Sequence, residues 1–337
     1  MHFGETFGKL LKRNHYFLHI DFRKDVPLRS HKRVLHILSI IALLLVTVTV
    51  SIAVDQRRTV ARTTSTTKIR VVSSLDFYAQ AASAVLGQYG QVTAVINSPS
   101  VDAESFEPTT HTAKQVAKAD VIIENGLGYD DWLGKVVAAN GQEQRTINVG
   151  TDLMHRRVGE NPHIWYNPQA MPRLVAQMVT RFSSLQPEHK ATFKRNANRY
   201  LKTLAPWKKT IKQLKRTGHH QAVAVSEPVF NDTLTAVNLK ISDNHFARAV
   251  EEGTDPSPAD IAKLTRDFKQ HRVALWVVNT QNSQPIVNSM TKQARRYHIP
   301  VVQVTETLPS NQSYVRWMTN ELNQVKTALE EDNQHGK

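Results

Sequence analysis

The sequence contains no cysteine among its 337 residues. This absence excludes disulfide bonds, thiolate metal ligands, cysteine nucleophiles and attachment of a lipid through an N-terminal cysteine. Any metal ion bound by this chain must therefore be held by nitrogen and oxygen atoms. Hydrophobic residues make up 40% and charged residues 21%, which is typical of a globular protein. The length provides enough apolar material for two domains.

Acidic residues are scarcer than basic ones, and the imbalance is uneven along the chain. The formal net charge is +14, yet residues 1–70 hold 13 Lys and Arg against 4 Asp and Glu, and the remainder holds 30 against 25. A nucleic-acid-binding protein would concentrate basic residues on its folded domain, often with aromatic residues between them. The sequence therefore predicts no nucleic-acid partner.

One long hydrophobic run is present. Residues 34–54 contain no Asp, Glu, Lys or Arg, and 21 residues suit the roughly 20 that cross a bilayer as a helix. Residues 1–33 carry eight Lys and Arg, so the positive-inside rule predicts that they are cytoplasmic and that the chain beyond Asp55 is outside. We expect a single-pass transmembrane anchor over residues 34–54 and a linker over residues 55–67. A signal segment cleaved around residues 51–53, which would give a secreted protein, is the alternative.

Short β-branched runs alternate with helical patterns from residue 68 onward, which indicates parallel βαβ units. The exception is a very basic, mostly helical stretch over residues 168–216, with a break at residues 185–188 and with Pro206 expected to kink it or end its first part. Its basic residues suit a solvated face, with contact to anionic lipid as the alternative. The predicted strands are residues 69–73, 92–96, 121–124, 147–149, 222–226, 275–278 and 301–305.

The order of these segments predicts an α/β protein with two lobes of parallel sheet flanked by helices. The N-terminal lobe is expected over residues 68–167 and the C-terminal lobe over residues 217–333. The stretch over residues 168–216 would be a long linking helix between them.

One histidine and three glutamates carry the most informative chemistry. His163 lies in the proline-bounded run NPHIWYNP, Glu227 ends the run AVAVSE, Glu306 ends PVVQVTE, and Glu104 follows QVTAVI in a loop. Because open α/β sheets bind ligands beyond the carboxyl ends of their strands, two side chains from each lobe are expected to meet in the cleft. Three carboxylates repel one another there unless a proton or a cation neutralises them. Taken singly, each glutamate also suits a solvated loop and His163 a structural histidine.

Several motifs resemble the solute-binding proteins of ABC transporters for zinc and manganese. The most specific are FEPTTHTAKQVAKADVIIENGLGYDDWLGK at residues 106–135 and GENPHIWYNP at residues 159–168, with support from SEPVF, DPSP and VTET. The resemblance covers residues 68–328. It implies two lobes joined by a rigid helix, with one divalent metal ion bound in the cleft as cargo. It also implies an extracytoplasmic, monomeric protein without enzymatic activity that passes Zn²⁺ or Mn²⁺, or Fe²⁺, to a permease and its ATPase.

The resemblance implies the metal ligands His163, Glu227, Glu306 and, at the remaining position, Glu104. The family usually has Asp-Pro-His before its aromatic-Glu-Pro-Thr run, whereas this chain has Asp-Ala-Glu at residues 102–104. One imidazole with three carboxylates is a harder ligand set than a histidine-rich zinc site, which favours manganese or iron(II), although intrinsic affinity runs higher for zinc than for manganese. Candidates for supporting hydrogen bonds are Ser226, Asn279 and Thr305.

Other interpretations stay open. Without the customary histidine, the chain could be a degenerate homologue that acts as an adhesin or surface interaction protein. A metal-dependent hydrolase could use Glu104 or Glu227 as a base, but the sequence has no HExxH run, no Gly-x-Ser-x-Gly elbow and no Gly-rich phosphate loop. His111 could replace the missing ligand, although we expect it to be exposed in the first turn of a helix. His219 and His220 lie in a Gly-containing connection and are expected to be solvated.

Overall fold

The computed structural model describes residue 42 and residues 67–217 and 220–335. The chain divides into Met1–Ser65 and the compact unit Thr66–Lys337. Apart from Ala42 and Thr67, the expected cytoplasmic segment, membrane anchor and linker lie outside the described residues. Among the helices that the described residues form, none combines the length and apolar character needed to cross a bilayer.

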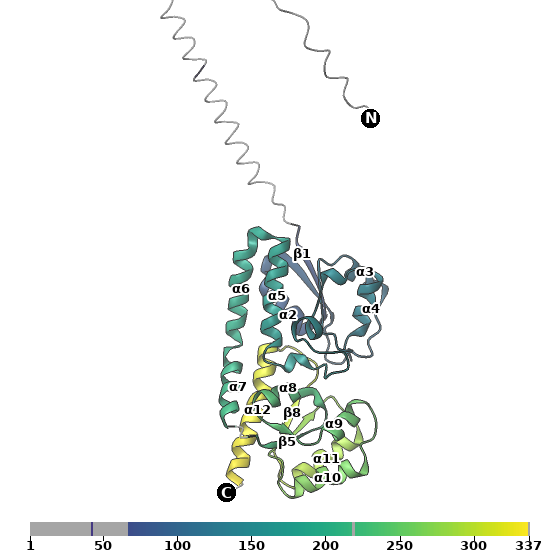
Figure 1. The fold of residues 1–337 in the computed structure, drawn as a ribbon, viewed down its shortest axis with the longest axis vertical. Helices are drawn as coiled ribbons and strands as arrows, with labels where there is room; N and C mark the ends of the chain where they lie inside the picture. Colours follow the sequence, from purple (N-terminus) through teal and green to yellow (C-terminus); the bar gives the residue numbers. More distant parts are fainter. Residues whose placement is uncertain (1–41, 43–66, 218–219, 336–337) are drawn as a thin grey trace, which may run out of the picture. The chain divides into compact units, whose positions relative to one another are not determined.

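Two four-stranded parallel sheets form the framework of the compact unit (Figure 1). Their strand orders are β2-β1-β3-β4 and β6-β5-β7-β8, and every neighbouring pair is parallel. This confirms the predicted α/β class with two parallel sheets. The strands are β1 (Ile69–Leu75), β2 (Gly90–Ile96), β3 (Val121–Glu124), β4 (Thr146–Asn148), β5 (Ala222–Val225), β6 (Lys240–Ile241), β7 (Trp276–Asn279) and β8 (Val301–Val304).

Helices flank the first sheet on both sides: Figure 1 shows α2 and α5 on one side and α3 and α4 on the other. The start of α3 is fixed by its sequence, because the Thr109 side chain accepts the backbone N–H of Thr112 while the Thr112 side chain accepts that of Thr109. The helices of this lobe are α2 (Asp76–Leu86), α3 (Thr110–Ala117), α4 (Asp131–Ala139) and α5 (Ala170–Leu185).

The basic stretch over residues 168–216 is not one linking helix. It comprises α5, α6 (Lys190–Thr203) and α7 (Ala205–Thr217), and the predicted break is the short turn Pro187–His189 between α5 and α6. Only Leu204 separates α6 from α7. Pro206, which has no backbone N–H to continue the helical ladder, explains this second interruption. The expected linking helix is therefore present as three consecutive helices, interrupted close to the two places where the sequence predicts a break.

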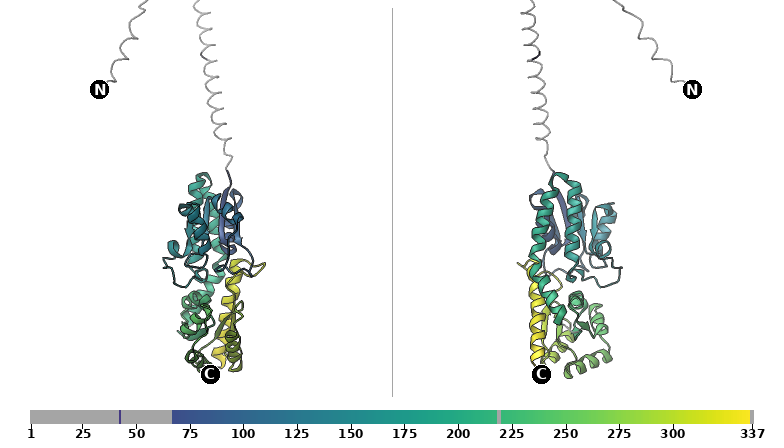
Figure 2. Two further views of the ribbon diagram at one scale, coloured as in Figure 1. Left: turned by 90° about the vertical axis from the view of Figure 1, so that its right-hand side faces the viewer. Right: turned by 60° about the vertical axis from the view of Figure 1, so that its left-hand side comes forward.

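The second sheet is flanked by the helices of the C-terminal half. Ser257 caps one of them by accepting the backbone N–H of Asp260. The last helix packs along α7 and β8, and both views of Figure 2 show it running the length of this half. The helices are α8 (Asn231–Ala236), α9 (Asn244–Glu251), α10 (Pro258–Lys269), α11 (Pro285–Arg296) and α12 (Tyr314–His335).

A buried aromatic cluster joins the two lobes. The ring centroid of Phe77 in α2 lies 5.4 Å from that of Trp165 and 5.7 Å from that of Trp317 in α12, and the rings of Tyr166 and Trp317 are 5.4 Å apart. All four side chains are almost completely buried. They belong to one hydrophobic cluster that also includes Val223 and Val225 of the second sheet, so both lobes share a core. Such packing restricts movement between the lobes.

Gly126 occupies a turn after β3 that admits no side chain. Its φ is +77°, and an added Cβ would lie 2.3 Å from Asn148 Oδ1. We predict that Gly126→Ala lowers the free energy of unfolding by roughly 2–3 kcal/mol, because backbone strain and overpacking add. Gly141→Ala is the matched control, since Gly141 has φ +61° and an added Cβ meets nothing within 4 Å. Denaturant unfolding that gives equal losses for both variants would contradict the steric argument.

Candidate metal centre

His163 is a buried histidine held from its own loop by Asn161. The Asn161 side-chain oxygen accepts the backbone N–H of His163 at 3.0 Å and lies 2.8 Å from Nδ1. The Asn161 amide nitrogen donates to Pro228 O at 2.8 Å, which ties this loop to the second lobe. Because an amide oxygen can only accept, Nδ1 carries the hydrogen, and in the neutral ring Nε2 keeps its lone pair. His163 therefore presents Nε2 as the nitrogen able to bind a metal ion.

Glu306 faces that nitrogen from beyond the end of β8. Its Oε1 lies 3.8 Å from His163 Nε2. The same oxygen accepts a 3.0 Å hydrogen bond from the hydroxyl of Tyr129, which lies between β3 and α4 in the first lobe. Glu306 thus contacts the first lobe at two side chains, those of His163 and Tyr129.

Glu227 lies just beyond β5 with its two oxygens in different surroundings. Oε1 accepts a 2.8 Å hydrogen bond from the Asn282 amide. Oε2 is buried and has no hydrogen-bond partner among the described residues. A buried carboxylate oxygen without a partner is costly unless a proton or a cation reaches it. This oxygen is therefore a suitable position for a metal ligand.

Glu104 lies in a loop whose backbone is held by its neighbours. Asp102 accepts the backbone N–H of Glu104 at 2.9 Å and the hydroxyl of Ser105 at 2.8 Å. The Trp132 indole donates to Ala103 O at 3.1 Å. These bonds fix the loop while the Glu104 side chain stays exposed. The carboxylate is therefore free to turn toward a ligand.

A cleft of about 490 Å³ lies beside these carboxylates. The loop over residues 99–102 lines it from the first lobe, and polar side chains line it from the second. Gln281 donates to Pro99 O at 2.8 Å, and the Thr307 hydroxyl donates to the same carbonyl at 3.0 Å, so this loop is fastened to the second lobe. The lining residues of the second lobe are Glu227, Asn279, Gln281, Asn282, Glu306 and Thr307.

The four predicted ligands alter one another's ionisation. Partial desolvation raises the pKa of Glu104, whose side chain keeps its contact with solvent, and burial raises the pKa of Glu227; the charge of Glu306 raises both further. Burial opposes a charged imidazole at His163, but the nearby carboxylate of Glu306 and the charge of Glu251 outweigh it and raise the pKa of His163. At Glu306 burial is in turn outweighed by His163, so its pKa is lowered. His163 and Glu306 thus favour an ion pair when a proton is available.

Within the described residues, no group of three or more His, Cys, Asp or Glu side chains has the geometry to hold a metal ion. His163 and Glu306 lie at ion-pair distance, whereas Glu104 and Glu227 act on them through charge. In the absence of a cation the carboxylates repel one another. One oxygen of Glu227 accepts a hydrogen bond from the Asn282 amide, and one oxygen of Glu306 accepts a hydrogen bond from the Tyr129 hydroxyl. Side-chain rotations would be needed to bring all four onto one ion.

Glu251 is a fourth carboxylate near His163 that the sequence analysis missed. It ends α9, and its Oε1 lies 3.7 Å from His163 Nδ1, on the side of the ring away from Nε2. Burial raises the pKa of Glu251 to about 7. The charge of His163 opposes this shift, and the charges of nearby carboxylates add to it. No local pattern marks this residue, because α9 reads as an ordinary amphipathic helix that ends in two glutamates.

The spare histidines lie away from the cleft lining. His111 is exposed in the first turn of α3, and His220 is exposed, both as expected. His219 lies outside the described residues.

Of the three supporting residues suggested by the sequence, Asn279 acts on two predicted ligands and Ser226 holds the backbone of Asn279. The Ser226 hydroxyl accepts the backbone N–H of Asn279 at 2.9 Å. The Asn279 side chain acts to lower the pKa of Glu227 and of Glu306, which favours the ionised form of each. Thr305 instead donates its backbone N–H to Glu321 at 2.9 Å, in the buried layer behind the cleft.

Comparison with known proteins gives relatives along most of the chain. The zinc-binding lipoprotein AdcA of Streptococcus pneumoniae serotype 4 is 20% identical over 245 residues, which cover 67% of this chain and 48% of AdcA. The metal ABC transporter substrate-binding lipoprotein SsaB of Streptococcus sanguinis is 23% identical over 265 residues, covering 74% of this chain and 84% of SsaB. The chain thus spans about half the length of AdcA and most of SsaB.

Solved structures give the same fold. An Mn-bound mutant of a periplasmic metal binding protein from Candidatus Liberibacter asiaticus superposes with a TM-score of 0.63 at 17% identity, covering 78% of this chain and 100% of that one. At this identity the likeness shows the fold alone. A family model described as zinc-uptake complex component A periplasmic matches residues 71–328, well over half of the chain. The chain therefore belongs to the ZnuA family, zinc-uptake complex component A periplasmic.

Proposed function

We propose that this chain is the solute-binding component of an ABC transporter for metal uptake. It captures a divalent transition-metal ion in the cleft between its lobes and passes the ion to a permease driven by an ATPase. The observation that carries the proposal is the pairing of His163 Nε2 with Glu306 across 3.8 Å, with the charges of Glu104 and Glu227 acting on the same pair. In support, the relative AdcA is named zinc-binding, and the similar structure from Candidatus Liberibacter asiaticus contains manganese.

The spacing of the first two ligands suits one shared ion. Metal–nitrogen and metal–oxygen bonds of about 2.0–2.2 Å place two ligands of one ion roughly 3–4 Å apart. His163 and Glu306 already have that separation. Glu227 Oε2, which is buried without a hydrogen-bond partner, is the third ligand, and Glu104 closes the site from its loop. Zn²⁺ and Mn²⁺ are the proposed cargo, with Fe²⁺ as a third candidate.

Without a metal ion, the site favours a protonated His163. The raised pKa of His163 and the lowered pKa of Glu306 favour an imidazolium whose Nδ1 side faces Glu251 and whose Nε2 proton faces Glu306. A divalent ion at Nε2 replaces that proton and neutralises two carboxylates rather than one. Binding therefore needs no large movement of the lobes, which agrees with their shared core.

The proposed location is the extracytoplasmic side of the membrane. The hydrophobic run over residues 34–54 would tether the monomeric binding unit near its permease. The linker over residues 55–67 would set how far the binding unit can extend from the membrane. Alkaline extraction of membranes from expressing cells, followed by protease treatment of intact cells, tests this arrangement. A chain released by alkali or protected from protease would contradict the tether.

Metal selection by the whole chain tests the proposal directly. The full chain is purified in mild detergent, stripped with a chelator, dialysed against equal Mn²⁺, Zn²⁺ and Fe²⁺, and analysed for elements. We expect about one metal ion per chain, since the proposed ligand set contains one imidazole nitrogen, that of His163. A metal-free product would overturn metal capture and favour the degenerate homologue.

Metal affinity should depend steeply on pH. A protonated imidazole cannot bind a metal ion, and the pKa of His163 is raised, so protons compete even near neutral pH. The raised pKa of Glu104 and of Glu227 adds competition at lower pH. We therefore predict that affinity falls about fivefold over the first pH unit below the His163 pKa and about tenfold for each further unit. Titrations that give equal affinity at pH 5 and pH 7.5 would exclude this ligand set.

A further inference from the structure

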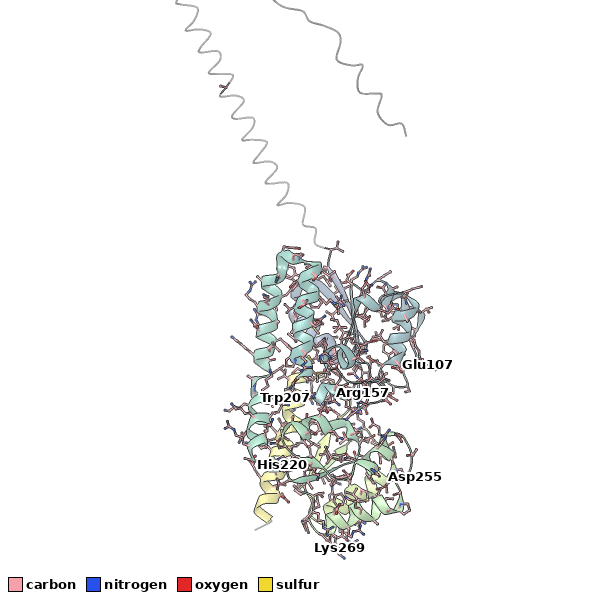
Figure 3. All side chains as sticks on the ribbon, viewed as in Figure 1. Glu107, Arg157, Trp207, His220, Asp255 and Lys269 are labelled. Atoms are coloured by element: carbon pink, nitrogen blue, oxygen red, sulfur yellow. The ribbon has the colours of Figure 1, made fainter. Side chains whose placement is uncertain are left out.

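The helices α6 and α7 carry ten Lys and Arg residues and no Asp or Glu. All ten side chains are exposed. None forms an ion pair in the part of the chain that the structure describes. Nitrogen-tipped side chains project from the outer edge of both helices in Figure 3. We call this set the basic face: Lys190, Lys194, Arg195, Arg199, Lys202, Lys208, Lys209, Lys212, Lys215 and Arg216.

Many basic side chains of this face are direct neighbours along the helices. Lys190 and Lys194, Arg195 and Arg199, and Lys208, Lys212 and Arg216 follow one another at four-residue spacing, where side chains on a helix are neighbours. Like-charged neighbours at this spacing destabilise a helix, and no acidic side chain of α6 or α7 relieves them. Basic side chains that weaken the helices and have no acidic partner within them indicate a binding partner outside the protein.

The basic face starts where the compact unit meets the preceding chain. Gln186, at the end of α5, donates to Thr67 O at 3.0 Å, and α6 begins four residues later at Lys190. Thr67 directly follows the expected linker, and the only hydrophobic run of bilayer length in the sequence, residues 34–54, precedes that linker. The start of the basic face is therefore close, within the fold, to the point where the chain from this run enters the compact unit.

We infer that the basic face binds the anionic phospholipid surface of the membrane that anchors the chain. Negative headgroups attract clustered Lys and Arg over about one Debye length, which long flexible side chains can reach. A single-stranded nucleic acid is a poorer fit, because the aromatic residues of these helices are not available for stacking. Phe193 and Trp207 are buried and Tyr200 is half-buried.

Lipid contact leaves the cleft free. The cleft is lined by residues 99–102 and by polar residues of the second lobe, and α6 and α7 contribute none of them. The inference rests on the proposed membrane location but not on metal binding. Loss of metal binding and loss of lipid contact are therefore separate experimental outcomes.

The absence of cysteine makes a clean test possible. In the full chain, Gln213→Cys places one fluorophore on exposed α7, and Asn288→Cys places one on exposed α11 as a control. Each labelled chain is reconstituted into vesicles of phosphatidylcholine, alone or with about one third phosphatidylglycerol, carrying headgroup-linked acceptors. We expect energy transfer at position 213 to rise several-fold with phosphatidylglycerol at about 0.05 M salt and to be lost at about 0.5 M, with no such change at position 288.

Two charge variants complete the test. Changing Lys194, Arg195, Lys209 and Lys212 together to Gln should abolish the lipid-dependent transfer. Changing Lys114, Lys118, Lys269 and Lys292 to Gln removes the same charge from other exposed positions and should leave the transfer intact; Figure 3 places Lys269 at the far end of the second lobe. Equal transfer in both lipids, or equal loss in both variants, would overturn the inference. Metal stoichiometry should be the same in both variants, which separates this outcome from failure of the proposed function.

Discussion

His163→Ala should abolish measurable metal binding, with at least a hundredfold loss of affinity. The substitution removes the nitrogen ligand and leaves Glu306 and Glu251 facing each other without the imidazole between them. Two carboxylates that share a site without a cation take up protons, and a proton on either one competes with the metal. Isothermal titration of the chelator-stripped full chain with Zn²⁺ and with Mn²⁺ measures the loss.

Three further variants give the expected order of effects. Glu227→Gln keeps the shape but replaces the unpartnered Oε2 by an amide group, so its loss should approach that of His163→Ala. Asn161→Ala leaves every ligand in place but removes the acceptor that fixes the imidazole, which typically weakens a metal site by about 10–100-fold. His220→Ala is the control and should change nothing, because this side chain is exposed outside the cleft lining. A dominant effect of His220 would exclude the cleft as the binding site.

The strands were predictable because alternation of β-branched runs with helical patterns is a local signal. Seven of the eight strands fall where the sequence places them, within about two residues at their ends. The exception, β6, pairs through two residues only and is too short to produce a pattern. The two interruptions of the basic helical stretch also had local signals, because Pro187 and Pro206 lack the backbone N–H that continues a helical ladder.

The candidate site was predictable only in part, because some of its contacts are made between lobes. His163 has a local signature in its proline-bounded loop, and Glu227 and Glu306 stand at strand ends. Tyr129 and Glu251 have no such mark. Tyr129 reaches Glu306 across 177 positions of sequence, and Glu251 reaches His163 from the end of an unremarkable helix. Only the packing of the two lobes brings these groups together.

A buried carboxyl group behind the cleft also escaped sequence analysis. Glu321 of α12 accepts hydrogen bonds from Trp317 Nε1 at 2.8 Å and from the backbone N–H of Thr305 at 2.9 Å, and its Oε2 lies 2.6 Å from the Tyr166 hydroxyl. That hydroxyl is also within donor distance of Thr305 O. A hydroxyl has one hydrogen, so a proton on Glu321 lets both contacts be hydrogen bonds. Burial accordingly raises the pKa of Glu321 to about 8, although the donors around it favour the ionised form.

Glu321 connects the two elements that carry His163 and Glu306. Tyr166 ends the turn that follows His163, and Thr305 directly precedes Glu306. We therefore predict that Glu321→Ala lowers the free energy of unfolding by about 4 kcal/mol, because it opens a cavity and leaves buried donors unpaired. Glu321→Gln is the matched control. Its amide can donate to Tyr166 and accept from Trp317, so at pH 5.5 it should be within about 1 kcal/mol of the parent chain.

The difference in stability between the parent chain and Glu321→Gln should depend on pH, and this dependence tests the protonation of Glu321 independently of its packing. The folded-state pKa of about 8 lies above the ordinary glutamate value of 4.5, so the stability that the neutral carboxyl contributes is complete below about pH 4.5 and is lost as pH rises to about 8. Between pH 5.5 and pH 8 the parent chain should therefore lose roughly 2–3 kcal/mol relative to Glu321→Gln, whose amide does not titrate. Other buried acids, such as Asp243 with a pKa raised to about 8, change both proteins equally and cancel in the difference. Denaturant unfolding at the two pH values measures it, and a constant difference would mean that Glu321 is ionised throughout and that Tyr166 shares its single hydrogen between two acceptors.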